Sequence, residues 1–229
     1  MRTAMFILAL AVAPLAMAQD AVVLKRVAKE GDVAKYALKV ETEISGAPVK
    51  FTANVIEKVM KVLADGTYTV SSEQEDTVLE INGETSPAPA NVSSPTTSTF
   101  GLDGSVTDIQ GDESGVDAYR MANIQAFLWP KEAVKEGSKW EADIKENKSK
   151  ETPMVHCKYE VVGKETIGEH NVFKINFESA ETTGDDPASS KGSVWVDIAS
   201  GLIVKTECEW KNAPIATMKL DGKVTMTLI

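Results

Sequence analysis

Apolar and polar residues alternate along most of this chain, and this period of two decides its fold class. From Tyr36 to Ile44 lysines and glutamates separate most of the apolar side chains, and the segment 155–161 repeats the pattern. One buried and one solvated face in each segment is typical of antiparallel strands. After the N-terminal segment the sequence has no continuous apolar runs of the kind that parallel α/β sheets need. We therefore predict a mainly β protein with an antiparallel sheet.

The parity of the apolar positions locates the turns between strands. Before Asp65–Gly66 these positions are mostly odd and after it they are even, as a two-residue type I′ turn requires. Parity is kept across Gly168–His170 and across Ala199–Gly201, which indicates three-residue loops. From position 218 to 228 the apolar positions are all even, so we predict one long last strand that continues through Gly222.

One helix is expected before Pro130, which ends it because proline has no amide donor for the helical hydrogen bond. Ser114 and Asp117 resemble a capping box at the start of this helix. The apolar residues that follow lie within one broad sector at 100° per residue, which is typical of an amphipathic helix. Arg120 falls inside this apolar sector and interrupts it.

Residues 1–18 have the three parts of a secretory signal peptide. Arg2 supplies the positive charge, the segment 4–15 is apolar, and Ala16–Ala18 matches an A-x-A cleavage site. The apolar run is shorter than the roughly 20 residues that a membrane-spanning helix needs. We expect export to the periplasm or the extracellular space, with no membrane span after cleavage. Because the residue directly after Ala18 is Gln19 and not a cysteine, we expect no lipid anchor.

The charge balance argues against two classes of partner. The chain has 24 Lys and Arg against 34 Asp and Glu, which gives a net charge of −10. Proteins that bind nucleic acids use Lys and Arg to neutralise phosphates, and anionic membrane surfaces attract basic segments. We therefore expect neither a nucleic-acid partner nor attraction to an anionic membrane.

Two segments of the chain resemble each other. The residues around Gly31 precede one predicted strand, and the residues around Gly137 precede another, with similar neighbours in both places. Each half then continues with a long strand, a glycine-containing turn and a return strand. We predict one β-rich domain over residues 19–229, built from pseudo-halves 19–130 and 131–229.

Two groups of residues resemble a known family. They are Trp129-Pro130, Val134, Gly137 and Trp140, followed by Val196-Asp197 and Gly201-Leu202-Ile203-Val204. This combination resembles a group of exported bacterial β-rich proteins of unknown function, similar in outline to the lipoprotein carriers (LolA/LolB-like). The resemblance implies a curved antiparallel sheet or open half-barrel with a concave apolar face. That face would accept an apolar or lipid-like ligand.

Residues for common catalytic chemistry are few. The histidines are His156 and His170, and neither has a metal-ligand spacing such as H-x-x-x-H. No serine lies in a G-x-S-x-G elbow, and no glycine-rich phosphate loop occurs. Asp103 and Asp197 stand at turns, where an aspartate side chain bonds the backbone more often than it catalyses. We expect no enzymatic activity, no metal and no cofactor.

Cys157 and Cys208 both occupy apolar positions of their strands. In an oxidising compartment a disulfide between them is plausible. The alternative is two buried reduced thiols that act as small apolar side chains. The sequence leaves both open.

Trp129, Trp140 and Trp195 are candidates for a ligand or partner face. Trp195 has the opposite parity to Val194 and Val196, so it lies under a loop, at an interface or inside a concavity. Ordinary core packing is the alternative for all three. We expect a non-enzymatic exported binding module for an apolar ligand. The alternative is a structural or interaction domain of the cell envelope, with an envelope protein as its partner and no small ligand.

Overall fold

A computed structural model describes residues 21–87, 95–112, 114–184, 186–215 and 218–229. The predicted signal peptide, residues 1–18, lies outside these residues. The elements are β1 (Val33–Ile44), β2 (Ala47–Val62), β3 (Tyr68–Ile81), β4 (Glu84–Pro87), β5 (Thr96–Phe100), β6 (Val106–Gln110), α1 (Val116–Gln125), β7 (Lys139–Ile144), β8 (Val155–Ile167), β9 (His170–Glu181), β10 (Ser189–Asp197), β11 (Ile203–Ile215) and β12 (Met218–Leu228). None of the described helical segments has the length and apolar character that a membrane-crossing helix needs.

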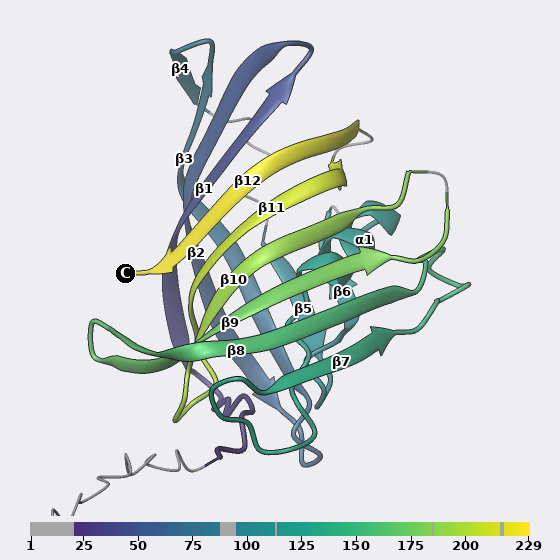
Figure 1. Cartoon of the computed structure of the whole chain (residues 1–229). Helices are drawn as coiled ribbons and strands as arrows, with labels where there is room; N and C mark the ends of the chain where they lie inside the picture. The colour runs from purple at the N-terminus through teal and green to yellow at the C-terminus, as the bar shows by residue number, and fades with distance from the viewer. Residues whose placement is uncertain (1–20, 88–94, 113, 185, 216–217) are drawn as a thin grey trace, which may run out of the picture.

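The strands form one antiparallel sheet that curls into an open half-barrel. Their order is β6-β5-β3-β2-β1-β12-β11-β10-β9-β8-β7, and β4 pairs with the end of β3. Figure 1 shows β10, β11 and β12 in front while β2, β5 and β6 pass behind them, with α1 between these two layers. The mainly β fold with an open, curved antiparallel sheet is therefore confirmed. The long last strand through Gly222 is also confirmed.

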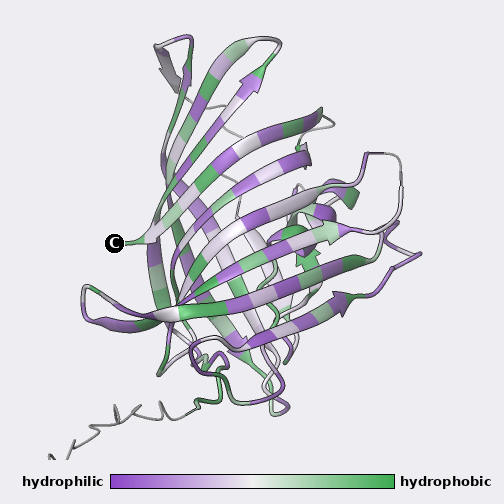
Figure 2. Cartoon of the chain, viewed as in Figure 1, coloured by the Kyte–Doolittle hydropathy of each residue, from purple (hydrophilic) through white to green (hydrophobic). Residues whose placement is uncertain are grey.

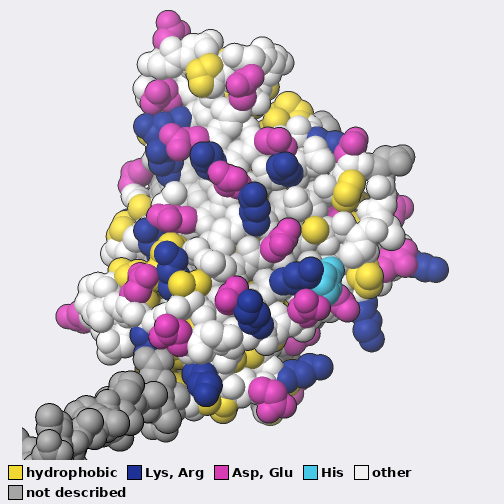
Figure 3. Space-filling model, viewed as in Figure 1, with side chains coloured by type: hydrophobic (Ala, Val, Ile, Leu, Met, Phe, Trp, Pro, Cys, Tyr) yellow, Lys and Arg dark blue, Asp and Glu magenta, His cyan; other side chains and the backbone are white. Residues whose placement is uncertain are grey.

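Alternation along each strand divides the sheet into two chemically different faces. Apolar and polar residues follow one another along the ribbons in Figure 2. Lysine and arginine side chains are mixed with aspartates and glutamates over the outer face in Figure 3. The acidic residues of the strands therefore lie mostly on a solvated surface, and the apolar set faces inward. This concave inner side, together with α1, is where the core forms.

Each of the three predicted turns is placed correctly along the chain, but its length differs from the prediction. The amide of Leu63 donates to the carbonyl of Thr67 at 2.8 Å, so the loop at Asp65–Gly66 has three residues rather than two. Ile167 pairs with His170 across a two-residue loop. The amide of Asp197 donates to the carbonyl of Leu202 at 2.8 Å, which leaves a four-residue loop.

A β-bulge next to each turn explains these differences. The pairing register shifts between Val59 and Lys61, between Val161 and Gly163, and between Trp195 and Val196. One extra residue in a strand inverts the parity of everything beyond it. The parity observed in the sequence is therefore the combined effect of a turn and a bulge.

The glycine segments of the two predicted halves make the same backbone hydrogen bonds. The amide of Gly31 donates to the carbonyl of Val59 at 2.8 Å, and the amide of Gly137 donates to that of Val161 at 2.8 Å. Both Val59 and Val161 lie next to a bulge. Pairing of β1 with β12 joins the strands of the two halves into one sheet. Duplication of the chain remains a prediction.

Helix α1 lies on the concave side and is shorter than predicted. It begins after Gly115, which provides no side-chain cap, so the capping box of Ser114 and Asp117 is not formed. The backbone leaves the helix at Ala126, well before Pro130. The helix contacts β9, β10 and β11 on one side and β6 on the other. It therefore reaches across the inside of the half-barrel.

A polar contact links the β7–β8 loop to the opposite edge strand. Nζ of Lys150 donates to the carbonyl of Thr107 in β6 at 2.6 Å. The same ammonium group lies 4.0 Å from the centre of the Tyr119 ring of α1, and the Tyr119 hydroxyl donates to Asp108 at 3.1 Å. The two unpaired sheet edges, β6 and β7, are thus connected through side chains rather than through strand pairing.

The largest core cluster fills only one end of the concave face. It joins the inner faces of β7, β8, β9 and β10 to the segment 124–134, with Ile124, Leu128 and Val134 almost fully buried. A smaller cluster around Cys208 and Val224 continues toward β12. The core is therefore densest under α1 and the segment that follows it.

A buried ion pair holds α1 against the sheet. Nε and Nη2 of Arg120 donate to the two carboxylate oxygens of Glu181 in β9, each at 2.7 Å. The amide of Ala188 donates to the same carboxylate at 2.7 Å. The Glu181 side chain is 1% exposed. This pair explains why a charged residue interrupts the apolar sector of the helix.

We expect Arg120→Ala to lower the free energy of unfolding by about 3 kcal/mol, because it leaves the buried Glu181 carboxylate without its cation. Lys139→Ala is the matched control, since it removes an exposed pair with Glu160 whose side chains are 69% and 47% exposed. The Lys139→Ala variant should lower the free energy of unfolding by less than about 1 kcal/mol. Urea unfolding of both variants checks this, and equal losses would contradict it.

Candidate functional site

Apolar side chains on the concave face of β1, β2, β3 and β12 are only half-buried. They are Leu38, Val40, Phe51, Leu79 and Met226. Strand register places them on one face, since Leu38 pairs with Met226 and Phe51 pairs with both Val40 and Leu79. The equivalent positions of β8 and β9, such as Val161 and Ile175, are 1% and 0% exposed. This partly exposed apolar surface is the candidate site.

A polar strip borders this apolar surface on β2 and β3. Glu57 follows Val55 on the inward side of β2 and pairs with Ser72 of β3. Gln74 pairs with Val55, and its Oε1 atom is buried without a hydrogen-bond partner. Burial raises the pKa of the Glu57 carboxyl, and the positive charge of Arg26 only partly opposes this shift. The strip therefore presents hydrogen-bond acceptors at the edge of an apolar surface.

Two tyrosines stand close to Glu57 on the same face. Burial, together with the negative charge of Glu57, raises the pKa of Tyr36 far above its usual value. Burial also raises the pKa of Tyr68 to about 12. The Tyr36 hydroxyl donates to the carbonyl of Ile203 at 3.1 Å, and the Tyr68 ring stacks on Phe100 at 5.1 Å. Both phenols therefore stay neutral and act as packing and hydrogen-bonding groups.

A second set of polar atoms lies deeper, in the part of the sheet that α1 contacts. Ser179, Ser190 and Trp210 are direct neighbours across β9, β10 and β11. The Oγ atoms of both serines and the Nε1 atom of the tryptophan are buried without a partner. These groups belong to the packed end of the concave face, where the core leaves less room than at β1 and β2.

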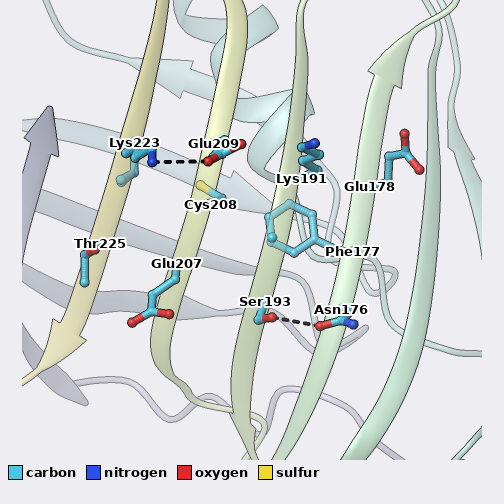
Figure 4. A pocket seen from close by; sticks show the side chains of 12 residues that line it. Asn176, Phe177, Glu178, Lys191, Ser193, Glu207, Cys208, Glu209, Lys223 and Thr225 are labelled. Carbon is cyan, nitrogen blue, oxygen red and sulfur yellow. Dashed lines mark hydrogen bonds and ion pairs between the residues drawn. The ribbon is translucent and has the colours of Figure 1, made fainter. Parts of the chain in front are cut away.

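The outer face carries a shallow trough across β9, β10, β11 and β12. Its volume is about 630 Å³, and Figure 4 shows two rows of outward side chains along it. One row holds Lys223, paired with Glu209 at 3.5 Å, together with Lys191 and Glu178. The floor is formed by the strands themselves and includes Gly192. Charges of both signs and an open shape are typical of a solvated sheet surface.

The three candidate tryptophans do not form one face, so that prediction is corrected. Trp129 and Trp140 pack around Phe127, with ring centres 4.9 Å and 6.0 Å away. Trp140 also stacks on Tyr159 at 4.8 Å, and its Nε1 donates to the carbonyl of Leu128 at 2.9 Å. These two tryptophans fix the segment after α1 to the sheet.

Trp195 lies on the opposite, outer side of the sheet and is 5% exposed. Its Nε1 donates to Glu165 at 2.7 Å. The ammonium groups of Lys174 and Lys205 lie 5.1 Å and 4.7 Å from its ring centre. Long charged side chains therefore cover this tryptophan, which explains how an outward residue becomes buried.

The structure has the second of the two alternatives for Cys157 and Cys208, since both are buried free thiols. Cys157 is in β8 and Cys208 is in β11, with β9 and β10 between them. Three strand spacings are about 14 Å, whereas a disulfide needs Cα atoms within about 7 Å. Parity placed both residues on the inner face correctly, but it carries no information about how many strands separate them.

We expect both thiols to react only when the protein unfolds, because burial raises the pKa of each and blocks access. Iodoacetamide should leave the native protein unmodified and add two groups in guanidinium chloride without reductant. Intact mass spectrometry measures this. A denatured protein that accepts the label only after reduction would contradict the structure.

Asp103 and Asp197 have the turn role that was predicted. Oδ1 of Asp103 accepts bonds from the amide and the hydroxyl of Ser105 at 3.0 Å and 2.6 Å. Oδ1 of Asp197 accepts the same two bonds from Ser200 at 2.8 Å and 2.6 Å. Although burial acts to raise it, the bonds from Ser200 and His170 hold the pKa of Asp197 below its usual value.

Ser200, Asp197 and His170 are not arranged as a catalytic triad. Nδ1 of His170 lies 3.2 Å from Oδ2 of Asp197, so the carboxylate stands between the serine and the histidine. A nucleophilic triad needs the histidine in that middle position. His156 lies on the outer face beside Asp143, at 2.7 Å. Within the described ranges no three His, Cys, Asp or Glu side chains form a group that could hold a metal ion.

Comparisons with known proteins give little beyond this geometry. No family model matches the chain, and no curated protein matches it. Among solved structures, the chain is similar to the hypothetical lipoprotein YmcC from Escherichia coli (K12), with 14% sequence identity and a TM-score of 0.37. That alignment covers 89% of each chain. The open antiparallel sheet agrees with the architecture that the carrier resemblance implies, and membership of that family remains a prediction.

Sequence reasoning overlooked Glu57, although a signal for it exists. The residue stands between Val55 and Val59 at a position where the alternation of β2 requires an inward side chain. A charged residue at an inward position is unusual in a sheet with one buried face. Departures from alternation are therefore a better guide to this site than the tryptophans were.

Proposed function

We propose that this protein is an exported, non-enzymatic binding module that holds an apolar or lipid-like ligand on the concave face of its sheet. The observation that carries the proposal is the contrast between the two ends of that face. At β8 and β9 most inward apolar residues, such as Val161 and Ile175, are almost fully buried, whereas Leu38, Val40 and Phe51 are only half-buried. An apolar surface that a protein leaves uncovered beside a packed core is typical of a binding site.

The length of α1 gives a physical reason for this contrast. Ten helical residues extend about 15 Å, which covers roughly three strand spacings of about 4.8 Å. The helix contacts β9, β10 and β11, and it leaves β12, β1 and β2 without a covering element of similar size. A ligand chain lying along these strands would complete the core.

Export and the absence of catalysis are parts of the same proposal. Export rests on the signal-peptide pattern of residues 1–18. The non-enzymatic role rests on the order of Ser200, Asp197 and His170, which suits a structural turn. Under this proposal the protein moves or shields its ligand without changing it.

Binding of the neutral fluorophore 1-N-phenylnaphthylamine tests the proposal. Fluorescence should rise and saturate at one equivalent. Leu38→Asn should weaken binding at least about fivefold, because burial of a leucine side chain contributes about 1.5–3 kcal/mol. Ala37→Asn is the matched control, since Ala37 is the neighbouring residue on the outer face and is exposed.

Circular dichroism and thermal melting should show that both variants fold. Absence of saturable binding, or equal weakening in both variants, would refute the concave site.

A second candidate function, an interaction domain of the cell envelope without a small ligand, is favoured by one observation. The outer trough of about 630 Å³ presents Lys191, Glu207 and other charges along four strands. A photo-crosslinking amino acid at Ser193 would then give a defined protein adduct in cells, and the same residue at Leu38 would give none. The reverse result supports the concave site.

A further inference from the structure

We propose that the polar end of the ligand is a primary ammonium group, held by Glu57 and Gln74 on the concave face. The inference rests on the proposed function and specifies the chemistry of the ligand. Three features support this assignment: acceptors without a donor, an excess of negative charge near Glu57, and an apolar surface that continues along β2.

Glu57 and Gln74 are neighbours on the same face of the sheet. Val55 and Val59, which flank Glu57 at the alternate positions of β2, are 7% and 5% exposed, so the side of β2 that they share faces inward. Glu57 pairs with Ser72 and Val55 pairs with Gln74, which places the two polar side chains on a diagonal between adjacent strands. Such diagonal neighbours are about 7–8 Å apart at Cα, within reach of one small group between them.

Both side chains offer acceptors, and no described residue supplies their donor. Oε1 of Gln74 is buried and has no hydrogen-bond partner. Among the hydrogen bonds and ion pairs between described residues, none reaches the Glu57 carboxylate. A buried acceptor without a donor, such as Oε1 of Gln74, is rare in native proteins and calls for a partner that is absent from the chain itself.

The nearest cation is engaged elsewhere. Nη1 of Arg26 donates to the carbonyls of Val27 and Ser200 at 3.2 Å and 3.3 Å, and Nη2 lies 3.8 Å from Asp32. Tyr36 and Tyr68, the other titratable groups close to Glu57, are neutral. Arg26, Asp32 and Glu57 together therefore carry one excess negative charge when Glu57 is ionised.

A cationic head group satisfies this balance better than a neutral or anionic one. An ionised carboxylate away from water is costly unless a partner of opposite charge accompanies it. An ammonium group brings both the charge and three donors. An alcohol brings donors without charge, and a carboxylate adds repulsion.

The apolar part of such a ligand has a surface to follow. Inward positions of β2 continue from Glu57 through Val55 and Ala53 to Phe51, a distance of about 20 Å at roughly 3.3 Å per residue. Leu38 and Val40 of β1 lie beside them. An alkyl chain attached to the ammonium group would extend along these strands.

Competition against bound 1-N-phenylnaphthylamine tests the inference with dodecylamine, dodecanol and dodecanoate, at concentrations below micelle formation. Wild-type protein should bind dodecylamine at least about tenfold more tightly than dodecanoate. Glu57→Gln should lower the affinity for dodecylamine about tenfold and change the affinity for dodecanol by less than about twofold. Glu73→Gln is the matched control, because Glu73 is an exposed carboxylate on the outer face of β3, and it should change nothing.

The outcomes separate this inference from the proposed function. If the three compounds bind equally in wild type, or Glu57→Gln leaves dodecylamine unchanged, the ammonium inference is wrong and the apolar site stands. If none of the compounds displaces the fluorophore and the fluorophore itself does not bind, the proposed function fails. Should Glu57→Gln not fold, the wild-type preference for amine over carboxylate decides alone.

Two lysophospholipids identify the source of the ammonium group once it is established. Lysophosphatidylethanolamine carries a primary ammonium group, and lysophosphatidylglycerol does not. Preference for the first, lost in Glu57→Gln, supports the inference with a lipid head group as the source. If the protein binds dodecylamine but neither lysophospholipid, the inference is supported with a free amine as the source.

Discussion

The size of α1 relative to the concave face is the constraint on which the rest of the structure depends. A curled antiparallel sheet must cover its inner apolar face, and this chain provides a helix of ten residues for twelve strands. The Arg120–Glu181 pair fixes the helix over β9, β10 and β11. Phe127 and its tryptophan neighbours continue this cover toward β7. The inner apolar residues that stay half-buried therefore lie on β1, β2, β3 and β12, outside the reach of the helix.

Curvature of the sheet comes from irregularities that the sequence pattern conceals. Register shifts occur between β2 and β3, β5 and β6, β8 and β9, β10 and β11, and β11 and β12. Bulges bend a strand and increase its twist, which lets a wide sheet curl. Alternation predicted the strands and located the turns. It did not predict loop lengths, since a bulge and a change in loop length have the same effect on parity.

The candidate site was less predictable than the fold, because it depends on which strands are neighbours. Parity placed Cys157 and Cys208 on the inner face, yet two strands separate them. Off-parity Trp195 is covered by lysine side chains on the outer face, an arrangement that requires knowledge of cross-strand partners. Glu57 breaks the alternation of β2 and was detectable from the sequence. Its lack of a partner is visible only in three dimensions.

Methyl NMR with a spin-labelled fatty amine tests the central claim most directly. A ligand on the concave face should broaden the methyl signals of Leu38, Val40 and Met226, which face inward. The methyl signals of Ala37 and Thr227, which flank them on the outer face, should broaden less because they lie farther from the label. Stronger broadening of the outer set, or no broadening of either set, would contradict the proposal that this half-barrel binds its ligand inside.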